Sequence, residues 1–203
     1  MANPALENYK KYCERINYYK GFGYNIEEER SFILEKSYPI YGDILEVGTG
    51  KGYFSIELAK EGHSFISVDI SEQDQELAKL SMKHFKFEDL VKFKIENAEH
   101  LSFDDSSFDI IFSINTIHHL ANPIKVIDEL VRIVTLEGKI ILSDFTKEGL
   151  EIMDKSHKKE HKEHEVGKIN LTAIEKYLSD KDFNIEKHRS RCQETLIACH
   201  PIA

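Results

Sequence analysis

The chain has 203 residues, of which 41% are hydrophobic and 31% charged, and it carries a formal net charge of −9. The acidic balance argues against a nucleic-acid partner, because phosphate contacts need clustered Lys and Arg, and no stretch approaches the ~18 apolar residues of a membrane span. The N-terminal residues lack the apolar centre of a signal peptide, and Cys13, Cys192 and Cys199 form no C-x-x-C pair, so we expect reduced thiols and a cytoplasmic location.

The chain begins with a pattern typical of two helices. Residues 5–20 and 26–37 favour helix, and the sequence Gly21-Phe22-Gly23 separates them. The second helix should stop near Pro39, because proline cannot continue a helix. These two helices form a predicted N-terminal helical lid over residues 1–38.

From Asp43 the pattern changes to apolar strands that alternate with amphipathic helices. Ser71 is expected to cap the helix after the second strand, with Asp74 three residues on, and Asn122-Pro123 should start the helix after the fourth. On that last helix Ile124, Ile127, Leu130, Val131 and Val134 are expected to face inward. The predicted strands are 43–48, 64–69, 91–96, 108–114 and 139–145, followed by helices over 147–165 and 171–180 and two antiparallel strands over 183–191 and 194–200.

Repeated strand–helix units predict an α/β fold with a Rossmann-like, doubly wound, mostly parallel seven-stranded sheet that ends in antiparallel strands. We expect one domain over 1–203, with a core over 39–145 and substrate-side elements over 146–203. Ligands of such sheets bind outside the carboxyl ends of the strands. The rim is predicted to carry Gly48, Asp69, Asn97, Asn115 and Asp144.

The stretch EVGTGKG, residues 46–52, places three glycines between a strand and a helix. Backbone N–H groups of such a loop face a ligand, and Asp69, at the end of the next strand, can accept hydrogen bonds from ribose hydroxyls. The dinucleotide pattern G-x-G-x-x-G needs a third glycine where Tyr53 stands. The charge of Glu46 would repel a pyrophosphate and attract an ammonium group. A ligand with a ribose and an amino-acid end, S-adenosylmethionine, satisfies these conditions.

The sequence resembles the class I S-adenosylmethionine-dependent methyltransferases, in particular the small-molecule branch of ubiquinone/menaquinone-biosynthesis type. ILEVGTGKGYFS matches the first motif of that family and VDIS the second. ENAEHLSFDDSSFDIIFSINTIHHL and LVRIVTLEGKIILSDF match the regions that follow. The resemblance covers roughly residues 40–145.

The resemblance implies a role for each of the matching positions. Glu46 would orient the methionine end, the glycine loop would approach it, and Asp69 would bind the ribose. Asn97 stands where the family usually has Asp, and its oxygen can still accept a hydrogen bond from adenine. The implied cofactor-binding residues are Glu46, Gly48, Thr49, Gly50, Gly52, Asp69, Ile70, Asn97, Ala98, Glu99, Ser113 and Asn115.

Three further side chains are candidates for a general base. His118, His119 and Asp144 follow the fourth and fifth strands, where a base could accept a proton from the methyl acceptor. The alternative is that one histidine packs against the following helix and the other is solvated or capping.

The segment HKKEHKEHEVG, residues 157–167, contains a second histidine pattern. On a helix, His157, His161 and His164 fall within an arc of roughly 60° beside Glu160, so they could supply the ligands of a zinc site. Residues 157–161, HKKEH, also match the H-x-x-E-H signature of inverted zinc peptidases. The alternative, which the composition favours, is a solvated helix face, because chance histidine patterns are frequent in a segment built from Lys, Glu and His. A metal there could present a nucleophile for methyl transfer.

Two other functions stay open at this point. A nicotinamide-dependent oxidoreductase is disfavoured by Tyr53 and Glu46. A cofactor-binding or metal-sensing module without turnover would share the same motifs. Tyr9, Tyr12 and Tyr19 either pack on the rim of the sheet or contact substrate, and Gly21 and Gly23 would allow the lid to hinge.

Overall fold

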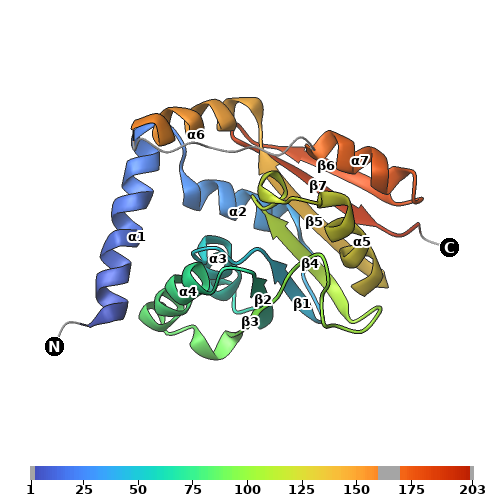
Figure 1. Ribbon diagram of the computed structural model, residues 1–203, viewed down its shortest axis with the longest axis horizontal. Coiled ribbons are helices and arrows are strands. Elements are labelled where there is room, and N and C mark those ends of the chain that lie inside the picture. The colour runs from blue at the N-terminus through green and yellow to red at the C-terminus, as the bar shows by residue number, and fades with distance from the viewer. Residues whose placement is uncertain (1–2, 160–169, 202–203) are drawn as a thin grey trace.

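The computed structural model describes residues 3–159 and 170–201, and a seven-stranded sheet lies at its centre (Figure 1). The strand order is β3-β2-β1-β4-β5-β7-β6, in which β1 to β5 are parallel, β7 runs antiparallel to β5, and β6 runs antiparallel to β7. This arrangement confirms the predicted fold class. The strands are β1 (Ile44–Val47), β2 (Phe65–Asp69), β3 (Val91–Ile95), β4 (Phe108–Ile114), β5 (Val134–Phe145), β6 (Asn184–Arg189) and β7 (Gln193–Cys199).

Helices cover both faces of the sheet, with α2 to α4 on one face and α5 and α7 on the other (Figure 1). Each strand therefore contributes alternate side chains to two cores. On β4, Ile110 and Phe112 enter the core shared with α3, whereas Ile111 enters the core shared with α5. The helices are α1 (Pro4–Gly21), α2 (Ile26–Lys36), α3 (Tyr53–Lys60), α4 (Glu72–Phe85), α5 (Pro123–Ile133), α6 (Lys147–Lys159) and α7 (Leu171–Ser179), with 3₁₀ turns η1 (Glu88–Leu90) and η2 (Ile117–His119).

The two predicted helix starts form by different contacts. The Ser71 hydroxyl accepts a hydrogen bond from the Asp74 N–H at 3.2 Å, so it caps α4 as expected. Asn122 precedes α5, but its side chain makes no capping bond and instead donates to Glu99 Oε1 at 2.9 Å. Pro123 at the first helical position starts α5 without that bond.

The predicted inward face of α5 and the predicted start of β5 are both partly wrong. Ile127 and Leu130 are buried as expected, and Ile124 and Val131 are half-buried against the same core, but the helix also buries Val126 and Ile133 and ends at Ile133. Val134 already belongs to β5 and pairs with Phe108. The register then shifts between Phe108 and Ile110, so β5 begins five residues before the predicted Lys139.

The N-terminal helix α1 lies outside α4 and reaches α6 at its other end (Figure 1). The Tyr9 ring stacks on His84 of α4 with centroids 3.9 Å apart, and the Tyr18 hydroxyl donates to the Ser156 carbonyl of α6 at 2.8 Å. Tyr12 is buried against Tyr53 and Phe85. Within the described part of the chain, no helix combines the length and apolar character that crossing a bilayer requires.

Candidate functional site

A cavity of about 580 Å³ opens at the carboxyl ends of β1, β2 and β4. The strand order reverses direction between β1 and β4, and ligands of doubly wound sheets bind at such a switch point. Eleven of the residues singled out from the sequence line this cavity. They are Glu46, Gly48, Thr49, Gly50, Asp69, Ile70, Asn97, Ala98, Glu99, Asn115 and His119.

The three glycines of the loop are needed for three different reasons. Gly48 has φ +92°, and a Cβ there would lie 2.1 Å from Thr116 Oγ1. Gly52 has φ +81° and does not line the cavity; a Cβ there would lie 2.8 Å from the Cβ of Ala78 on α4. Only Gly50, with φ +49°, faces open space. Gly50 is therefore the glycine that leaves room for a ligand.

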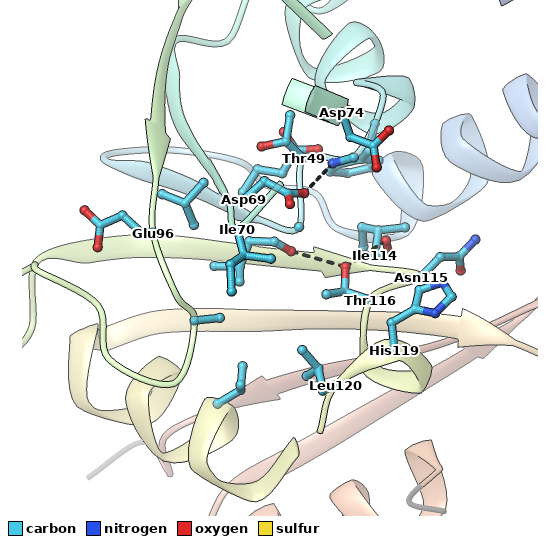
Figure 2. A pocket seen from close by; sticks show the side chains of 18 of the residues that line it. Thr49, Asp69, Ile70, Asp74, Glu96, Ile114, Asn115, Thr116, His119 and Leu120 are labelled. Carbon is cyan, nitrogen blue, oxygen red and sulfur yellow. Dashed lines mark hydrogen bonds between the residues drawn. The ribbon is translucent and has the colours of Figure 1, made fainter. Parts of the chain in front are cut away.

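Asp69 ends β2 with a fully oriented carboxylate (Figure 2). Oδ2 accepts the Gly50 N–H at 2.7 Å, and Oδ1 accepts the Ser71 N–H at 2.8 Å. Each carboxylate oxygen has a second lone pair for a ligand hydroxyl. Asp69 thus joins the glycine loop to the start of α4 and remains an acceptor within the cavity.

Glu46 lines the cavity from the end of β1, although its side chain is only 2% exposed. Its Oε2 accepts hydrogen bonds from Ser55 and from Ser67, the latter at 2.6 Å. Burial raises the pKa of Glu46 to about 7, even though both serine hydroxyls favour the charged form. A cation that binds next to Glu46 would therefore favour loss of its proton and formation of the charged carboxylate.

The end of the cavity near β2 and β3 is apolar with a polar edge. Ile70 is 70% exposed, which is unusual for isoleucine, and it lies below Asp69 in Figure 2. Asn97 Oδ1 accepts the Glu99 N–H at 3.0 Å, so one lone pair of that oxygen is already used. A flat heterocycle could contact Ile70 and hydrogen-bond this edge.

At the opposite end, Asn115 and His119 lie together beyond β4 (Figure 2). Asn115 holds a left-handed backbone with φ +54°, a conformation that is uncommon outside glycine and frequent at functional sites. Its Oδ1 is buried without a hydrogen-bond partner among the described residues, as is the Oγ of Ser113. Ser113 itself is buried and does not line the cavity.

The two histidines after β4 have different environments. His118 is buried, and its Nδ1 lies 2.6 Å from Asp144 Oδ1, while its backbone N–H donates to Oδ2 of the same carboxylate at 3.1 Å. His119 lines the cavity with its ring centroid 3.9 Å from that of His118. Asp144 and His118 therefore hold η2 in place, and of these three side chains His119 alone lines the cavity.

The predicted metal ligands cannot be assembled from the described residues. His161, His164 and Glu160 lie outside them, and His157 belongs to α6 without a described side chain. Over residues 3–159 and 170–201, no group of three His, Cys, Asp or Glu side chains could hold a metal ion. The histidine-rich metal site stays a prediction.

Several cavity residues carried no signal in the sequence. Arg30 looks like part of a solvated helix face in IEEERSFILEK, yet it is buried in the cavity wall. Thr116 is the reason that residue 48 must be glycine, but the two residues meet only in the folded structure, so the sequence does not reveal it. Further lining residues that the sequence did not indicate are Tyr53, Ile114, Leu120 and Val126.

Comparison with known proteins identifies the domain. Residues 45–142 match a family described as "Methyltransferase domain". A demethylmenaquinone methyltransferase of Clavibacter sepedonicus is 31% identical over 109 residues, which are 53% of this chain and 43% of that protein. The ubiquinone/menaquinone biosynthesis C-methyltransferase UbiE of Citrifermentans bemidjiense is 27% identical over 52% of this chain and 46% of its own length. These comparisons support a class I S-adenosylmethionine-dependent methyltransferase domain over residues 45–142.

The fold agrees with this methyltransferase family. A crystal structure of a SAM-dependent methyltransferase from Aquifex aeolicus has a TM-score of 0.65 and 19% identity, covering 83% of this chain and 88% of that one. The match to the curated methyltransferases, by contrast, spans less than half of their length. The match thus covers the core around the cavity, and the flanking helices of the chain lie largely outside it.

Proposed function

We propose that the protein transfers a methyl group from S-adenosylmethionine to a small-molecule acceptor. The observation that carries this proposal is the cavity itself, in which Gly50 faces open space and two acidic groups, Glu46 and Asp69, line the wall. A ribose suits the oriented carboxylate of Asp69, and an ammonium group suits Glu46. In this proposal residues 1–203 act as one domain, in which 1–38 and 146–203 shape the acceptor side.

The residues around the cavity fit S-adenosylmethionine without a phosphate subsite. Ile70 and Ala98 offer an apolar surface for adenine, with Asn97 and Glu99 at its polar edge. A hydrogen bond between Thr49 Oγ1 and Ser67 Oγ, 2.6 Å long, holds the Thr49 side chain in place. When bound, S-adenosylmethionine supplies an electrophilic methyl group on a positively charged sulfur. The protein positions the acceptor and excludes water.

His119 is the proposed base for an acceptor that arrives protonated. It faces the cavity beside Asn115, while His118 and Asp144 fix the turn on which it stands. As the acceptor atom bonds the methyl carbon, the carbon–sulfur electron pair stays on sulfur, and the acceptor proton passes to the His119 imidazole. His119→Gln is expected to lower kcat about 100-fold while leaving product affinity unchanged. An unchanged kcat would remove His119 from this role.

A metal bound by His157, His161, His164 and Glu160 is a separate part of the proposal. Its support is the spacing of the histidines in the sequence and their place in the chain after β5. Elemental mass spectrometry of untagged protein, purified without chelator, tests it. About one transition metal per chain that disappears in a His157→Ala/His164→Ala double variant would support the site. Metal-free protein after incubation with excess zinc would refute it.

The central experiment measures binding and transfer separately. Calorimetry should show binding of S-adenosylmethionine and S-adenosylhomocysteine but no binding of NAD. Transfer is then followed with radiolabelled methyl donor and a set of small acceptors, beginning with demethylated quinones because of the relatives' names. Binding without transfer to any acceptor would favour the module without turnover. Binding of NAD alone would favour the oxidoreductase.

A further inference from the structure

The N-terminal helix α1 brings one arginine to the wall of the cavity. Arg15 is half-buried, and its Nη1 donates to the hydroxyl of Tyr53 at 3.1 Å. Tyr53 is the first residue of α3, directly after the glycine loop, and it lines the cavity. The Tyr53 ring also stacks on Tyr12 of α1, with ring centroids 5.4 Å apart. Arg15 is therefore held against a fixed cavity residue.

Arg15 lies on a flank of α1 that faces the neighbouring helices. Asn8, Arg15 and Tyr18 fall within an arc of roughly 80° around the helix axis. Asn8 Nδ2 donates to the Leu77 carbonyl of α4 at 3.0 Å, and the Tyr18 hydroxyl donates to the Ser156 carbonyl of α6 at 2.8 Å. These two contacts hold α1 in place at both ends and leave Arg15 between them.

Arg15 has no counter-charge in the described part of the chain. Over residues 3–159 and 170–201, no carboxylate lies within ion-pair distance of its guanidinium. Arg132 and Arg191, by contrast, pair with glutamates at 2.8 Å and 2.6 Å respectively. The bond to Tyr53 uses one N–H of Arg15, and no described residue accepts the others. The guanidinium can therefore donate to an anionic ligand.

The Tyr53 hydroxyl supplies a second donor. It accepts the Arg15 N–H, and its own proton has no acceptor among the described residues. Burial raises the pKa of Tyr53, although the charges of Arg15 and Arg30 oppose that rise, so the hydroxyl keeps its proton at neutral pH. A guanidinium beside a protonated phenol offers two hydrogen-bond donors to an oxyanion.

We propose that Arg15 and Tyr53 bind an oxyanion, a carboxylate or a phosphate, that the methyl acceptor carries. This inference rests on the proposed function and narrows its substrate class to anionic small molecules. The anion holds one end of the acceptor at the cavity wall, and this contact restricts how the rest of the molecule can lie. Arg15 then determines specificity and takes no part in the transfer itself.

The test uses protein saturated with S-adenosylhomocysteine and three small aromatic probes: benzoate, phenyl phosphate and uncharged benzamide. An NMR titration should show that the wild-type complex binds at least one of the anions about tenfold more tightly than benzamide. The anion that binds more tightly identifies the charged group of the acceptor. In Arg15→Gln the preference should fall below about twofold, and Arg15→Lys should recover part of it, since it restores the charge without the planar fork.

Lys10→Gln is the matched control. Lys10 is exposed on the same helix and does not line the cavity, so this variant removes one positive charge from α1 without touching the proposed site. It should keep the wild-type preference. The wild-type titration needs no variant to fold, and equal wild-type affinities for the anionic and uncharged probes would overturn the inference. An unchanged preference in Arg15→Gln would do the same.

Affinity for S-adenosylhomocysteine separates this inference from the proposed function. Arg15→Gln should bind S-adenosylhomocysteine within about threefold of wild type, because the lost contact belongs to the acceptor. A larger loss of product affinity would assign Arg15 to the cofactor and overturn the inference. If the wild-type protein did not bind S-adenosylhomocysteine, the proposed function itself would fail. Intact product binding without discrimination between the probes removes only the assignment of Arg15 and Tyr53.

Discussion

Glu46 is a carboxyl group that burial keeps close to half-titrated at neutral pH. Its raised pKa means that the folded protein without ligand holds a proton where the unfolded chain has lost it. An ammonium group in the cavity requires the charged carboxylate, so ligand binding must expel that proton. Affinity and stability should therefore respond to pH in opposite directions.

The first prediction concerns affinity. Between pH 5.5 and about 7, affinity for S-adenosylhomocysteine should rise by up to about tenfold per pH unit and then level off, because one proton is released on binding. Calorimetry in buffers of different ionisation enthalpy measures that proton directly. Glu46→Gln should bind weakly at every pH and release none. A flat wild-type profile would show that Glu46 does not meet the ammonium group.

The second prediction concerns stability without ligand. The pKa of Glu46 rises from 4.5 in the unfolded chain to about 7 in the folded protein, so its contribution is lost as pH increases through that window. Above pH 7 the buried Glu46 carboxylate lowers the free energy of unfolding by about 3 kcal/mol relative to its value at low pH. Urea unfolding at pH 5.5 and 8 should therefore show a smaller loss of unfolding free energy in Glu46→Gln than in wild type. Equal losses of unfolding free energy in the variant and in wild type would contradict the raised pKa of Glu46.

Among the individual cavity residues, the sequence predicted those that belong to a motif. It missed those that come together only when the chain folds. Glu46, Gly50 and Asp69 could be predicted because strand–loop–helix spacing fixes their positions. Arg30 could not, since a single arginine among glutamates looks like a solvated face until α2 packs over the rim. The pairing of Asp144 with His118 rather than with a ligand likewise depends on tertiary contact.

At the scale of elements, the loop between β1 and α3 needs glycine for two different purposes, close packing and an open cavity. Gly48 is required by Thr116 at the end of β4, and Gly50 leaves space in the cavity. The periodicity of the sequence predicted the strands on either side. It did not predict which glycine serves packing and which serves binding, because the neighbours come from β4 and α4.

The third prediction uses these two glycines as a matched pair. Gly48→Ala should lower the free energy of unfolding by about 3 kcal/mol, from the clash with Thr116 and the left-handed backbone. Gly50→Ala should cost only about 1 kcal/mol and still weaken S-adenosylhomocysteine binding at least tenfold. Urea unfolding and calorimetry on both variants distinguish these effects. Equal destabilisation would mean that Gly50 is also a packing residue.

Over the whole molecule, the parallel sheet and its helices could be predicted from the sequence. The contacts that the helices α1 and α6 make outside this core could not. Alternating strands and helices predicted the sheet, whereas the link between α1 and α6 depends on Tyr18 reaching the Ser156 carbonyl 138 residues away. The turn between α1 and α2 exposes Gly21 and Gly23 on each side of the half-buried Phe22. This turn is where the predicted lid would hinge.

The fourth prediction follows from that turn. Limited proteolysis should cleave the ligand-free protein near Gly21, and S-adenosylhomocysteine should slow the cut at least fivefold if α1 and α2 close over the bound cofactor. Mass spectrometry of the fragments locates the site. Cleavage at the same rate with and without ligand would contradict a closing lid.

The Tyr24 hydroxyl receives donors from α2, from the end of β4 and from β7, and its partner Gln193 is 169 residues away along the chain. While β7 is still being synthesised on the ribosome, Tyr24 therefore lacks one of the three hydrogen bonds that hold it behind the cavity wall. A nascent chain that has already formed β1 to β5 carries every cofactor motif and still lacks the support of Arg30. We expect that the cofactor cannot guide early folding, and that it selects only chains whose last strand has joined the sheet.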